Sequence, residues 1–366
     1  MSLPRYRILE EKQDKMVIDT ALTSKSLSDT RWASRKQATE AVLKSMPAII
    51  EALDVIINED VGSTPKAAAD AQGLLATIET FEFMFMLNFW NFVLEKTFCL
   101  SNYLQKSSID LISALAQIDS CASTLKQLKS DEGFEEIEKS AKEKAEECKI
   151  STEFKQGRVR KRKLFHDEVA TDEPVPISDS RTRFKEQTFF HILSVFDTQF
   201  ETRFKDLRNT ACKFQVLNEK YFFDKNSIQR INELAEFYSE DLDAECVERE
   251  YCSFRDVYKQ LFPSPDGGGF TTAEILPFLI ANDLHEAYPN VATLYRIFLT
   301  VPISSAQAER TFSRLKLIKT YLRSTMSETR LSHLATLYIE REVTATITFD
   351  NAIETFARMK KRKTKL

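Results

Sequence analysis

The stretch that decides the fold lies near the C-terminus, from Pro289 to Glu342. It opens with Ala292-Thr-Leu-Tyr-Arg-Ile-Phe-Leu299, and Val301-Pro302 then interrupts the apolar pattern. The next segments are Ser304-Ser-Ala-Gln-Ala-Glu-Arg-Thr-Phe-Ser313, Leu315-Lys-Leu-Ile-Lys-Thr-Tyr-Leu-Arg-Ser-Thr-Met326 and Arg330-Leu-Ser-His-Leu-Ala-Thr-Leu-Tyr-Ile339. Apolar residues recur every three or four positions, which is the period of an amphipathic helix. The stretch therefore predicts helices separated by a proline break.

The second of these helices combines a cap, a carboxylate and a basic face. Ser304 or Ser305 can cap its start, and Glu309 lies in its first turn, where the helix dipole favours a negative charge. One face is apolar, and the other carries basic residues that begin with Arg310. Spacing alone makes Glu309 a solvated helical carboxylate rather than a catalytic group.

The composition favours a helical protein without zinc fingers. The 366 residues include only 7 Gly and 10 Pro, too few for the turns of a many-stranded β protein. The net charge of −4 gives no global basic field, so nucleic acid would need a local patch. Six dispersed cysteines form no CxxC pair, which excludes a zinc finger and indicates buried, reduced thiols. No apolar run is long enough for a membrane span or a signal peptide.

The order of the helical patterns predicts a mainly α fold in seven segments. Residues 1–37 are an N-terminal remnant, 38–129 and 183–262 are two helical regions, and 270–345 is a C-terminal helical region. We expect a long helical region from Lys66 to about Leu104, and an aromatic stripe after Arg183 that belongs to a core. Residues 130–182 are charged and read as a disordered linker, 263–269 is a Pro/Gly linker, and 346–366 is a short helix with a basic tail.

Two basic clusters indicate either nuclear import or phosphate contacts, with a solvated segment as the plain alternative. The import interpretation is favoured because the cluster occurs twice. The residues assigned to import are Arg158, Arg160, Lys161, Arg162, Lys163, Lys360, Lys361, Arg362 and Lys363.

The residues around Glu309 closely resemble the C-terminal block of hAT-superfamily transposases, whose pattern is Ser-x-x-x-x-Glu-Arg-x-Phe-Ser. The likeness runs from Tyr288 to about Glu342. Leu27-Ser-Asp-Thr-Arg-Trp-Ala-Ser-Arg35 is similar to the Thr-Arg-Trp segment of the same family. Within the family, the chain looks most like the transposase-derived group called zinc finger MYM-type protein 1-like.

This resemblance implies a ribonuclease-H-like domain that a helical insertion splits. Here residues 38–262 would be the insertion and 270–345 the C-terminal remnant of the split domain. Two aspartates and one glutamate of the family hold metal ions for two-metal phosphoryl transfer, and Glu309 matches the glutamate. The resemblance assigns nucleic-acid contacts to Arg31, Trp32 and Arg310, with an indole suited to base stacking. The alternative for Trp32, which we favour, is packing at a helix start.

The family's aspartates lie upstream of the Arg-Trp segment, and the sequence departs from that pattern. Thirty residues precede Arg31, and they include aspartates but no strand-like apolar run. We therefore expect no strand cleavage by this chain alone, no cofactor and no resident metal. Mg²⁺ would be needed only by a complete catalytic domain.

The resemblance also implies self-association through the C-terminal block, 270–345. We expect an exposed apolar face there, while mutual burial within a monomer is the alternative. The residues assigned to dimerisation are Leu294, Ile297, Phe298, Phe312, Leu315, Leu331, Leu334, Leu337 and Tyr338.

Two functions compete on the sequence. The favoured one is a non-catalytic, transposase-derived protein in the nucleus that pairs with itself or a related protein and contacts DNA or chromatin. The other is a truncated piece of an active hAT transposase that cleaves and transfers DNA strands. Neither involves a membrane or a small-molecule substrate.

Overall fold

The computed structural model describes residues 3–15, 32–58, 64–106, 109–155, 179–262, 270–320, 323 and 325–359. All regular elements in these residues are helical, and none of them forms a strand. The prediction of a mainly α fold is therefore confirmed. The chain divides into two compact units, Met1–Val301 and Pro302–Leu366. The Val301-Pro302 break seen in the sequence is thus the boundary between them.

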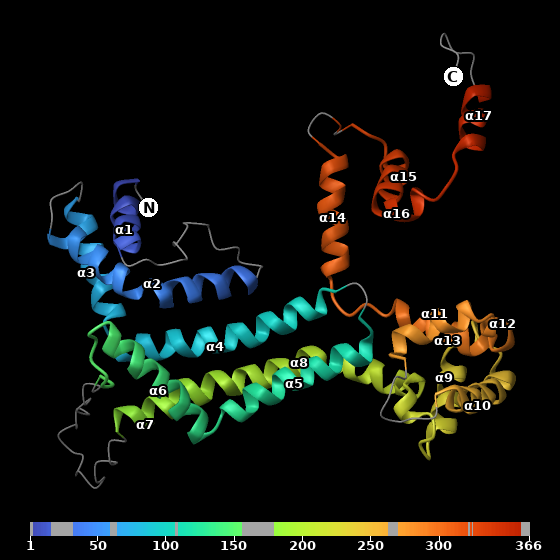
Figure 1. Cartoon of the computed structure of the whole chain (residues 1–366), viewed down its shortest axis with the longest axis horizontal. Coiled ribbons are helices and arrows are strands. Elements are labelled where there is room, and N and C mark those ends of the chain that lie inside the picture. Colours follow the sequence, from blue (N-terminus) through green and yellow to red (C-terminus); the bar gives the residue numbers. More distant parts are fainter. Residues whose placement is uncertain are drawn as a thin grey trace, which may run out of the picture. The chain divides into compact units, whose positions relative to one another are not determined.

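Long helices that lie side by side build the N-terminal part of the first unit (Figure 1). Neighbouring helices pack in the pairs α1 with α2, α2 with α4, α4 with α6, and α5 with α8. In chain order the elements are α1 (Leu3–Lys15), α2 (Trp32–Asn58), α3 (Pro65–Ile78), α4 (Phe81–Leu104), α5 (Leu111–Leu128), α6 (Asp131–Glu147), α7 (Ser180–Phe184), a π-helical turn (Lys185–Phe190) and α8 (His191–Phe214).

Four consecutive helices begin at a polar side chain that satisfies a free backbone N–H group. Thr64, Thr80, Asp110 and Ser130 each accept a hydrogen bond from the N–H group three residues further on. The cap at Thr80 separates α3 from α4, so the helical region expected from Lys66 to about Leu104 consists of two helices. The apolar periodicity of α3 continues into α4, so periodicity alone does not reveal the cap at Thr80 between them.

The core of this part is a cluster of phenylalanines that come from distant parts of the sequence. Phe85 of α4 lies with its ring centroid 4.9 Å from Phe134 of α6 and 5.7 Å from Phe189 of the π-helical turn. Phe85, Phe134 and Phe189 are each 0% exposed. The expected aromatic stripe after Arg183 is therefore core at Phe189, whereas Phe200 and Phe204 lie half-buried along α8.

The expected disordered linker at 130–182 is wrong for its first part. Residues 131–147 form α6, and its apolar side Phe134, Ile137 and Ala141 is buried against the core. Phe154 packs in the same cluster, 4.8 Å from Phe81. The high charge of this run misled the prediction, because one apolar residue per turn suffices for a helix that packs along one narrow side. Residues 156–178 lie outside the described residues.

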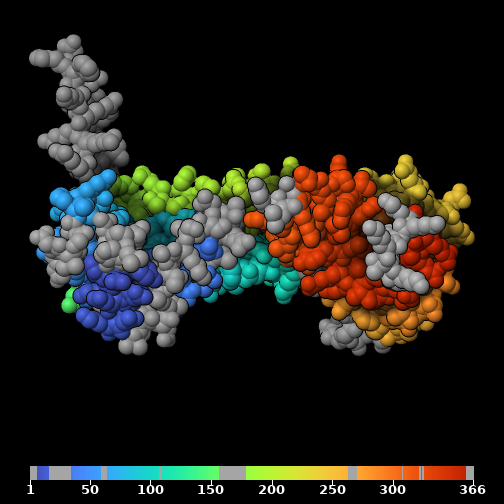
Figure 2. All heavy atoms as spheres, turned by 90° about the horizontal axis from the view of Figure 1, so that it is seen from above, coloured from blue at the N-terminus to red at the C-terminus, as the bar shows by residue number. Residues whose placement is uncertain are grey.

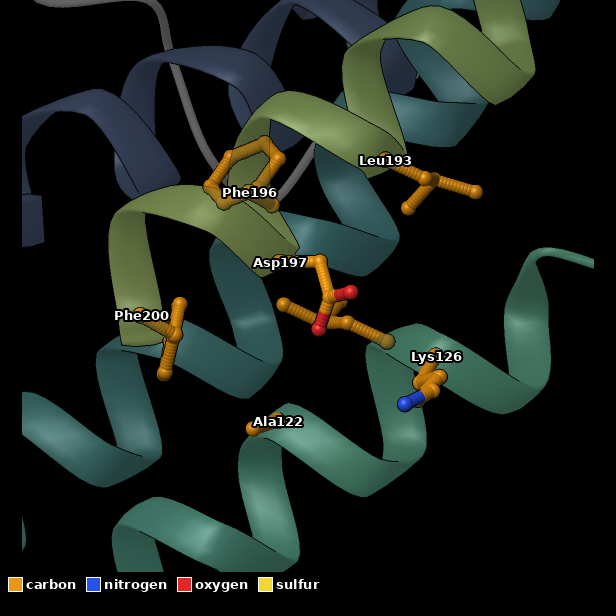
Figure 3. Close-up of a pocket in the computed structure, with 7 residues that line it drawn as sticks. Ala122, Lys126, Leu193, Phe196, Asp197 and Phe200 are labelled. Carbon is orange, nitrogen blue, oxygen red and sulfur yellow. The ribbon is translucent and has the colours of Figure 1, made fainter. Parts of the chain in front are cut away.

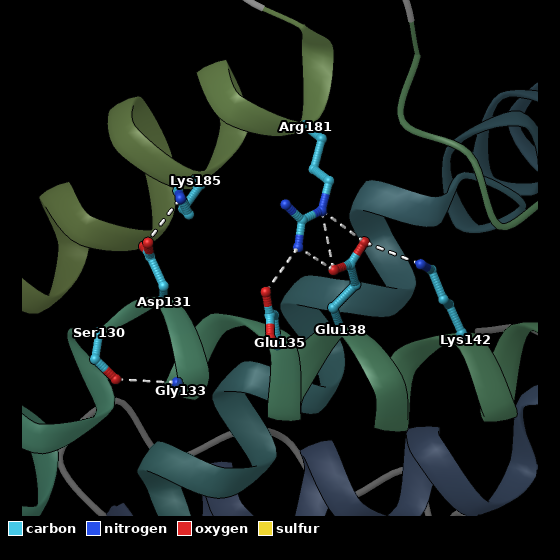
Figure 4. Close-up of polar contacts among 8 residues, drawn as sticks. All are labelled: Ser130, Asp131, Gly133, Glu135, Glu138, Lys142, Arg181 and Lys185. Atoms are coloured by element: carbon cyan, nitrogen blue, oxygen red, sulfur yellow. Dashed lines mark hydrogen bonds and ion pairs between the residues drawn. The ribbon is translucent and has the colours of Figure 1, made fainter.

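An ion-pair cluster fixes α7 to α6 (Figure 4). Glu138 is 6% exposed and accepts hydrogen bonds from the Arg181 guanidinium at 2.7 to 3.1 Å. Lys142 lies 3.1 Å from the same carboxylate, and Arg181 also covers the ring of Phe134. Burial opposes the ionisation of Glu138, but the hydrogen bonds from Arg181 and Lys142 outweigh it and keep the pKa of Glu138 below its ordinary value.

A second group of helices completes the first unit around buried tyrosines. The Tyr251 hydroxyl donates to Val216 O at 2.8 Å, and the Tyr295 hydroxyl donates to Leu217 O at 2.7 Å. Both tyrosines are 0% exposed, and burial raises the pKa of Tyr295 well above its ordinary value. The elements are two 3₁₀ turns (Gln215–Leu217, Glu219–Tyr221), α9 (Ser227–Phe237), α10 (Ala244–Leu261), α11 (Thr272–Ala281), α12 (Leu284–Ala287) and α13 (Pro289–Thr300).

The second unit contains two longer helices, one short turn of helix and a last amphipathic helix. α14 packs against α15 as a helical hairpin, and α16 follows α15 directly. The expected short helix at 349–357 is confirmed as α17. The elements are α14 (Ala306–Ile318), α15 (Glu328–Ile339), α16 (Arg341–Thr344) and α17 (Asp350–Met359).

Candidate dimerisation surface

Helix α14 begins with a local polar contact inside the segment from Ser304 to Ser313. The Ser305 hydroxyl donates to Glu309 Oε1 at 2.8 Å, and the Glu309 N–H group donates to Ser305 O at 2.9 Å. The sequence suggested that the Ser305 hydroxyl caps a backbone N–H group of α14. In the structure it makes no such cap and donates to the Glu309 carboxylate instead. Glu309 is exposed, at the helix end where the dipole favours it.

In the described residues, a polar contact and a thin apolar seam join α14 and α15 in the hairpin. Arg314 Nη1 donates to Ile339 O at 2.9 Å, so a cation lies at the negative end of the α15 dipole. Ile318 is 8% exposed, and Leu315, Leu331 and Leu334 are half-buried. Burial between two short helices is too little to make a core of ordinary size.

Most of the large apolar side chains of the second unit stay in contact with solvent. Phe312 is 68% exposed, Leu317 65%, Leu337 45% and Tyr338 40%. Figure 2 draws the atoms of this unit in orange and red. Apolar exposure on this scale is typical of a surface that binds a partner. The exposed set continues beyond the hairpin with Val343, Ile347, Phe349, Ile353, Phe356 and Met359.

Part of the predicted dimerisation face lies elsewhere. Leu294 and Phe298 on α13 are 0% and 1% exposed, and Phe298 packs 5.4 Å from Phe214. Ile297 beside them is half-buried. These residues belong to the core of the first unit, so they do not form an exposed face. Periodicity identified an apolar stripe correctly but could not tell whether the same chain covers it.

Sequence reasoning missed Leu317 as an exposed apolar residue. It falls off the 3.6-residue stripe that runs through Phe312, Leu315 and Ile318, so it was not included in the apolar face. The signal that could have identified Leu317 is its position, because it is an apolar residue on the otherwise polar side of α14.

The predicted nucleic-acid contacts are only partly described. Arg310 is exposed on α14, next to Glu309. Trp32 is the first residue of α2, but its side chain lies outside the described residues, as does Arg31. Both basic clusters assigned to nuclear import, 158–163 and 360–363, also lie outside them.

Two hollows in the described residues were considered as sites for a small molecule, and clusters of side chains as sites for a metal. The cavity between α5 and α8 in Figure 3 has a volume of about 10 Å³, room for one water at most. A hollow of about 390 Å³ between α9 and α10 is open to solvent and lined mainly by charged side chains such as Glu245 and Glu248. Within the described ranges, no three His, Cys, Asp or Glu side chains are placed to hold a metal ion.

The six cysteines were expected to be buried, reduced thiols. All six cysteines are free thiols, but only Cys121 is buried, so the expectation of buried thiols holds for that one alone. Burial raises the pKa of the Cys121 thiol.

Among the helices of the described residues, none is both long enough and apolar enough to cross a bilayer.

Comparison with known proteins identifies the class of this region. Residues 249–343 match the family model described as the hAT family C-terminal dimerisation region. The match begins inside α10 and ends inside α16, so it spans the boundary between the two units. It starts at 249, earlier than the 270 expected from the sequence. The chain therefore contains a hAT dimerisation region, and this supports a hAT-derived protein.

A curated mouse protein gives the more particular likeness. The 52 kDa repressor of the inhibitor of the protein kinase from Mus musculus is 23% identical to this chain over 386 residues. The alignment covers 93% of this chain but only 44% of the mouse protein, so the chain spans less than half the length of that relative. No solved structure matches the chain.

Proposed function

We propose that this chain is a non-catalytic, transposase-derived protein that acts as a homodimer through its second unit. The observation that carries the proposal is the exposure of Phe312, Leu317, Leu337 and Tyr338 inside a region that matches a dimerisation family. Burying such side chains contributes about 25 cal/mol per Å² of apolar area. A second copy of the chain offers the same unburied surface and so gains equally.

Co-purification of two differently tagged full-length copies tests the dimer. Phe312→Glu places a charge at the most exposed position of the hairpin and is expected to abolish co-purification. Leu74→Glu is the matched control, because Leu74 is 58% exposed on α3, outside the dimerisation match. Absence of co-purification for the wild type, or equal co-purification of both variants, would contradict the proposal.

The proposal extends to the finer identity of the protein. Residues 270–345 would be the remnant of a ribonuclease-H-like domain, and the chain would fall in the zinc finger MYM-type protein 1-like group. The name of the mouse relative, a repressor, supports a regulatory role over a catalytic one. The dimer would act in the nucleus with DNA or chromatin. Arg31, Trp32 and Arg310 are the proposed nucleic-acid contacts, and a salt-dependent titration with DNA measures them.

Nuclear import is assigned to the clusters at 158–163 and 360–363. Deletion of both in a reporter fusion is expected to abolish nuclear accumulation. An unchanged distribution of the reporter would remove the import assignment and leave the dimer proposal intact.

A second candidate function is strand cleavage as part of a longer transposase. It is favoured by Glu309, which keeps the family position and lies exposed, and by the 44% coverage of the mouse relative. The other two carboxylates would then come from residues outside this sequence. A Mg²⁺- or Mn²⁺-dependent nicking assay on the longer protein encoded when the reading frame is extended upstream, with Glu309→Gln as control, tests it. Nicking by the wild type, with none by Glu309→Gln, would overturn the non-catalytic proposal.

A further inference from the structure

Helix α11 is apolar on almost all sides, but the described residues bury it on one. Its ten residues include a single charged side chain, Glu274. Ile275 and Leu279 are 0% exposed on one side of the helix, which packs against α13 and α12. Pro277 and Ile280 lie on the other side and are exposed, Ile280 at 47%. A helix that is apolar all round is normally buried all round, so the outward side of α11 indicates a surface that covers it.

Three phenylalanine rings extend this outward side toward the end of α10. The Phe278 ring lies 5.7 Å from Phe262 and 4.9 Å from Phe270, and the latter two rings are 5.1 Å apart. All three residues are half-buried although their rings contact one another. Residues 263–269 separate two of them in the sequence and contain no large apolar side chain that could cover the rings. The α11 patch is defined as Phe262, Phe270, Pro277, Phe278 and Ile280.

The sequence around the α11 patch carries little charge. Between Leu261 and Asn282 the charged residues are Asp266, which lies outside the described residues, and Glu274. The Glu274 carboxylate accepts hydrogen bonds from the Thr271 N–H group at 2.8 Å and from the Thr271 hydroxyl at 2.9 Å. It is therefore held at the start of the helix, whereas Ile280 lies near the helix end.

The charges nearest to this segment in the flanking sequence are Lys259 and Asp283. The Lys259 ammonium lies over the Phe223 ring, 4.7 Å from its centroid, and Asp283 lies just before α12. The patch thus offers no array of cations of the kind that binds nucleic acid or anionic lipid. An identical uncharged patch is a suitable partner, because two such patches meet without like-charge repulsion.

The match to a dimerisation family favours a second copy as the partner. The matched residues 249–343 include every residue of the α11 patch. Of the large hydrophobic residues exposed within that match, Leu261, Ile280 and Leu299 belong to the first unit. Exposed apolar surface of the dimerisation region is therefore present in both units.

We propose that the α11 patch packs against the same patch of a second copy across a two-fold axis, with the two α11 helices antiparallel. The antiparallel arrangement places the two Glu274 carboxylates at opposite ends of the contact, whereas a parallel one would bring them together. This inference rests on the proposed dimer and adds to it a contact that the first unit makes.

Opposite charges at Ile280 test whether the patch pairs with itself. In the full-length chain, Ile280→Glu and Ile280→Lys should each raise the dissociation constant of the homodimer about 10-fold or more, because like charges then meet across the axis. Sedimentation velocity measures these constants. An equimolar mixture of the two variants should form heterodimers about 10-fold tighter than either homodimer, because opposite charges meet instead. Circular dichroism verifies that each variant stays folded, as expected for a side chain that is 47% exposed.

Val195→Glu is the matched control, because Val195 on α8 is also 47% exposed and lies outside the dimerisation match. It should change the dissociation constant less than about 3-fold. A wild-type dimer that both Ile280 variants leave unchanged would overturn the α11 contact and leave the proposed dimer standing. Two weakened homodimers without recovery in the mixture would overturn the self-pairing, as expected if the patch packed on a hairpin instead. A wild-type monomer at every concentration would overturn the dimer itself.

Discussion

The two units of this chain differ in what their apolar residues do. The first unit, up to Val301, buries many of its large aromatic residues, and Phe85, Phe189, Tyr251 and Tyr295 are each 0% exposed. In the described part of the second unit, Ile318 is the one apolar side chain that is buried. Ten of the 17 large hydrophobic residues exposed in the described structure lie in this second unit.

The difference shows that similar helices can serve opposite purposes. Helices of the first unit pack against several neighbours, so their apolar sides are buried in the core. Those of the second unit form one hairpin and a single amphipathic helix, so their stripes remain available. The first unit therefore has a core of its own, whereas the second unit presents the exposed apolar surface on which the proposed dimer rests.

The largest expected effect is on the core of the first unit. Phe189→Ala removes the ring that meets Phe85, Phe89 and Phe134, and should destabilise the first unit by about 4 kcal/mol. Thermal unfolding followed by circular dichroism measures the loss. Phe356→Ala in the second unit is the matched control and should leave the melting temperature of the first unit unchanged. Equal losses would break the contrast between the units.

The next effect comes from the polar clamp between α6 and α7. Arg181→Met leaves the buried Glu138 with Lys142 alone and should cost about 2 kcal/mol, less than for a fully buried pair because Arg181 is partly exposed. Denaturant unfolding at neutral pH measures this loss.

The same clamp predicts a pH dependence. The pKa of Glu138 is lowered in the folded state, so its contribution is present above the pKa of an unfolded glutamate and is lost as pH falls through the lowered folded value. Arg181→Met should therefore remove part of the acid sensitivity of the wild type. An identical acid response of the two proteins would count against the clamp.

A smaller effect is expected at a buried hydroxyl. Tyr295→Phe removes the donor to Leu217 O and leaves that carbonyl without its partner, at a cost of about 1.5 kcal/mol. Chemical denaturation with Tyr6→Phe as control measures the difference, because Tyr6 is only half-buried on α1. No loss at Tyr295 would mean that water replaces the hydroxyl.

The smallest effect sharpens the description of the second unit. Arg314→Met removes the donor to Ile339 O and should loosen the hairpin by about 1 kcal/mol. Hydrogen exchange at the C-terminal turn of α15 should become faster, while exchange in α4 stays the same. Unchanged exchange in α15 would show that the apolar seam alone holds the hairpin.

Much of the fold followed from the sequence because helical periodicity is a local property. The spacing of Leu111, Leu115, Ile118 and Leu125 predicts α5, and the structure places these residues on its buried side. The Val301-Pro302 break predicts the end of a helix, and α13 ends at Thr300. The two units divide at the same place, inside the region 270–345 that was expected to be continuous. A proline has no N–H group to donate and so favours a helix end, although Pro47 and Pro277 of this chain lie inside α2 and α11.

Burial was harder to predict, because it depends on what packs against a stripe. Leu294 and Phe298 have the same spacing as the apolar residues of α15, but α13 meets α10 and α11, while α15 meets only α14 and α16 closely. The charged run of α6 was taken for a linker since its few apolar residues looked insufficient. Contacts such as Phe134 with Phe189 join residues 55 positions apart, and no local pattern reveals them.

The oligomeric state of the full chain tests the central claim most directly. Sedimentation velocity from 0.1 to 50 µM would compare the wild type with Phe312→Glu at equal concentrations. The account predicts a wild-type dimer of about twice 42.2 kDa in the micromolar range and a monomer for the variant. A wild-type monomer at every concentration would contradict it, since the exposed apolar residues of the second unit would then need no second copy.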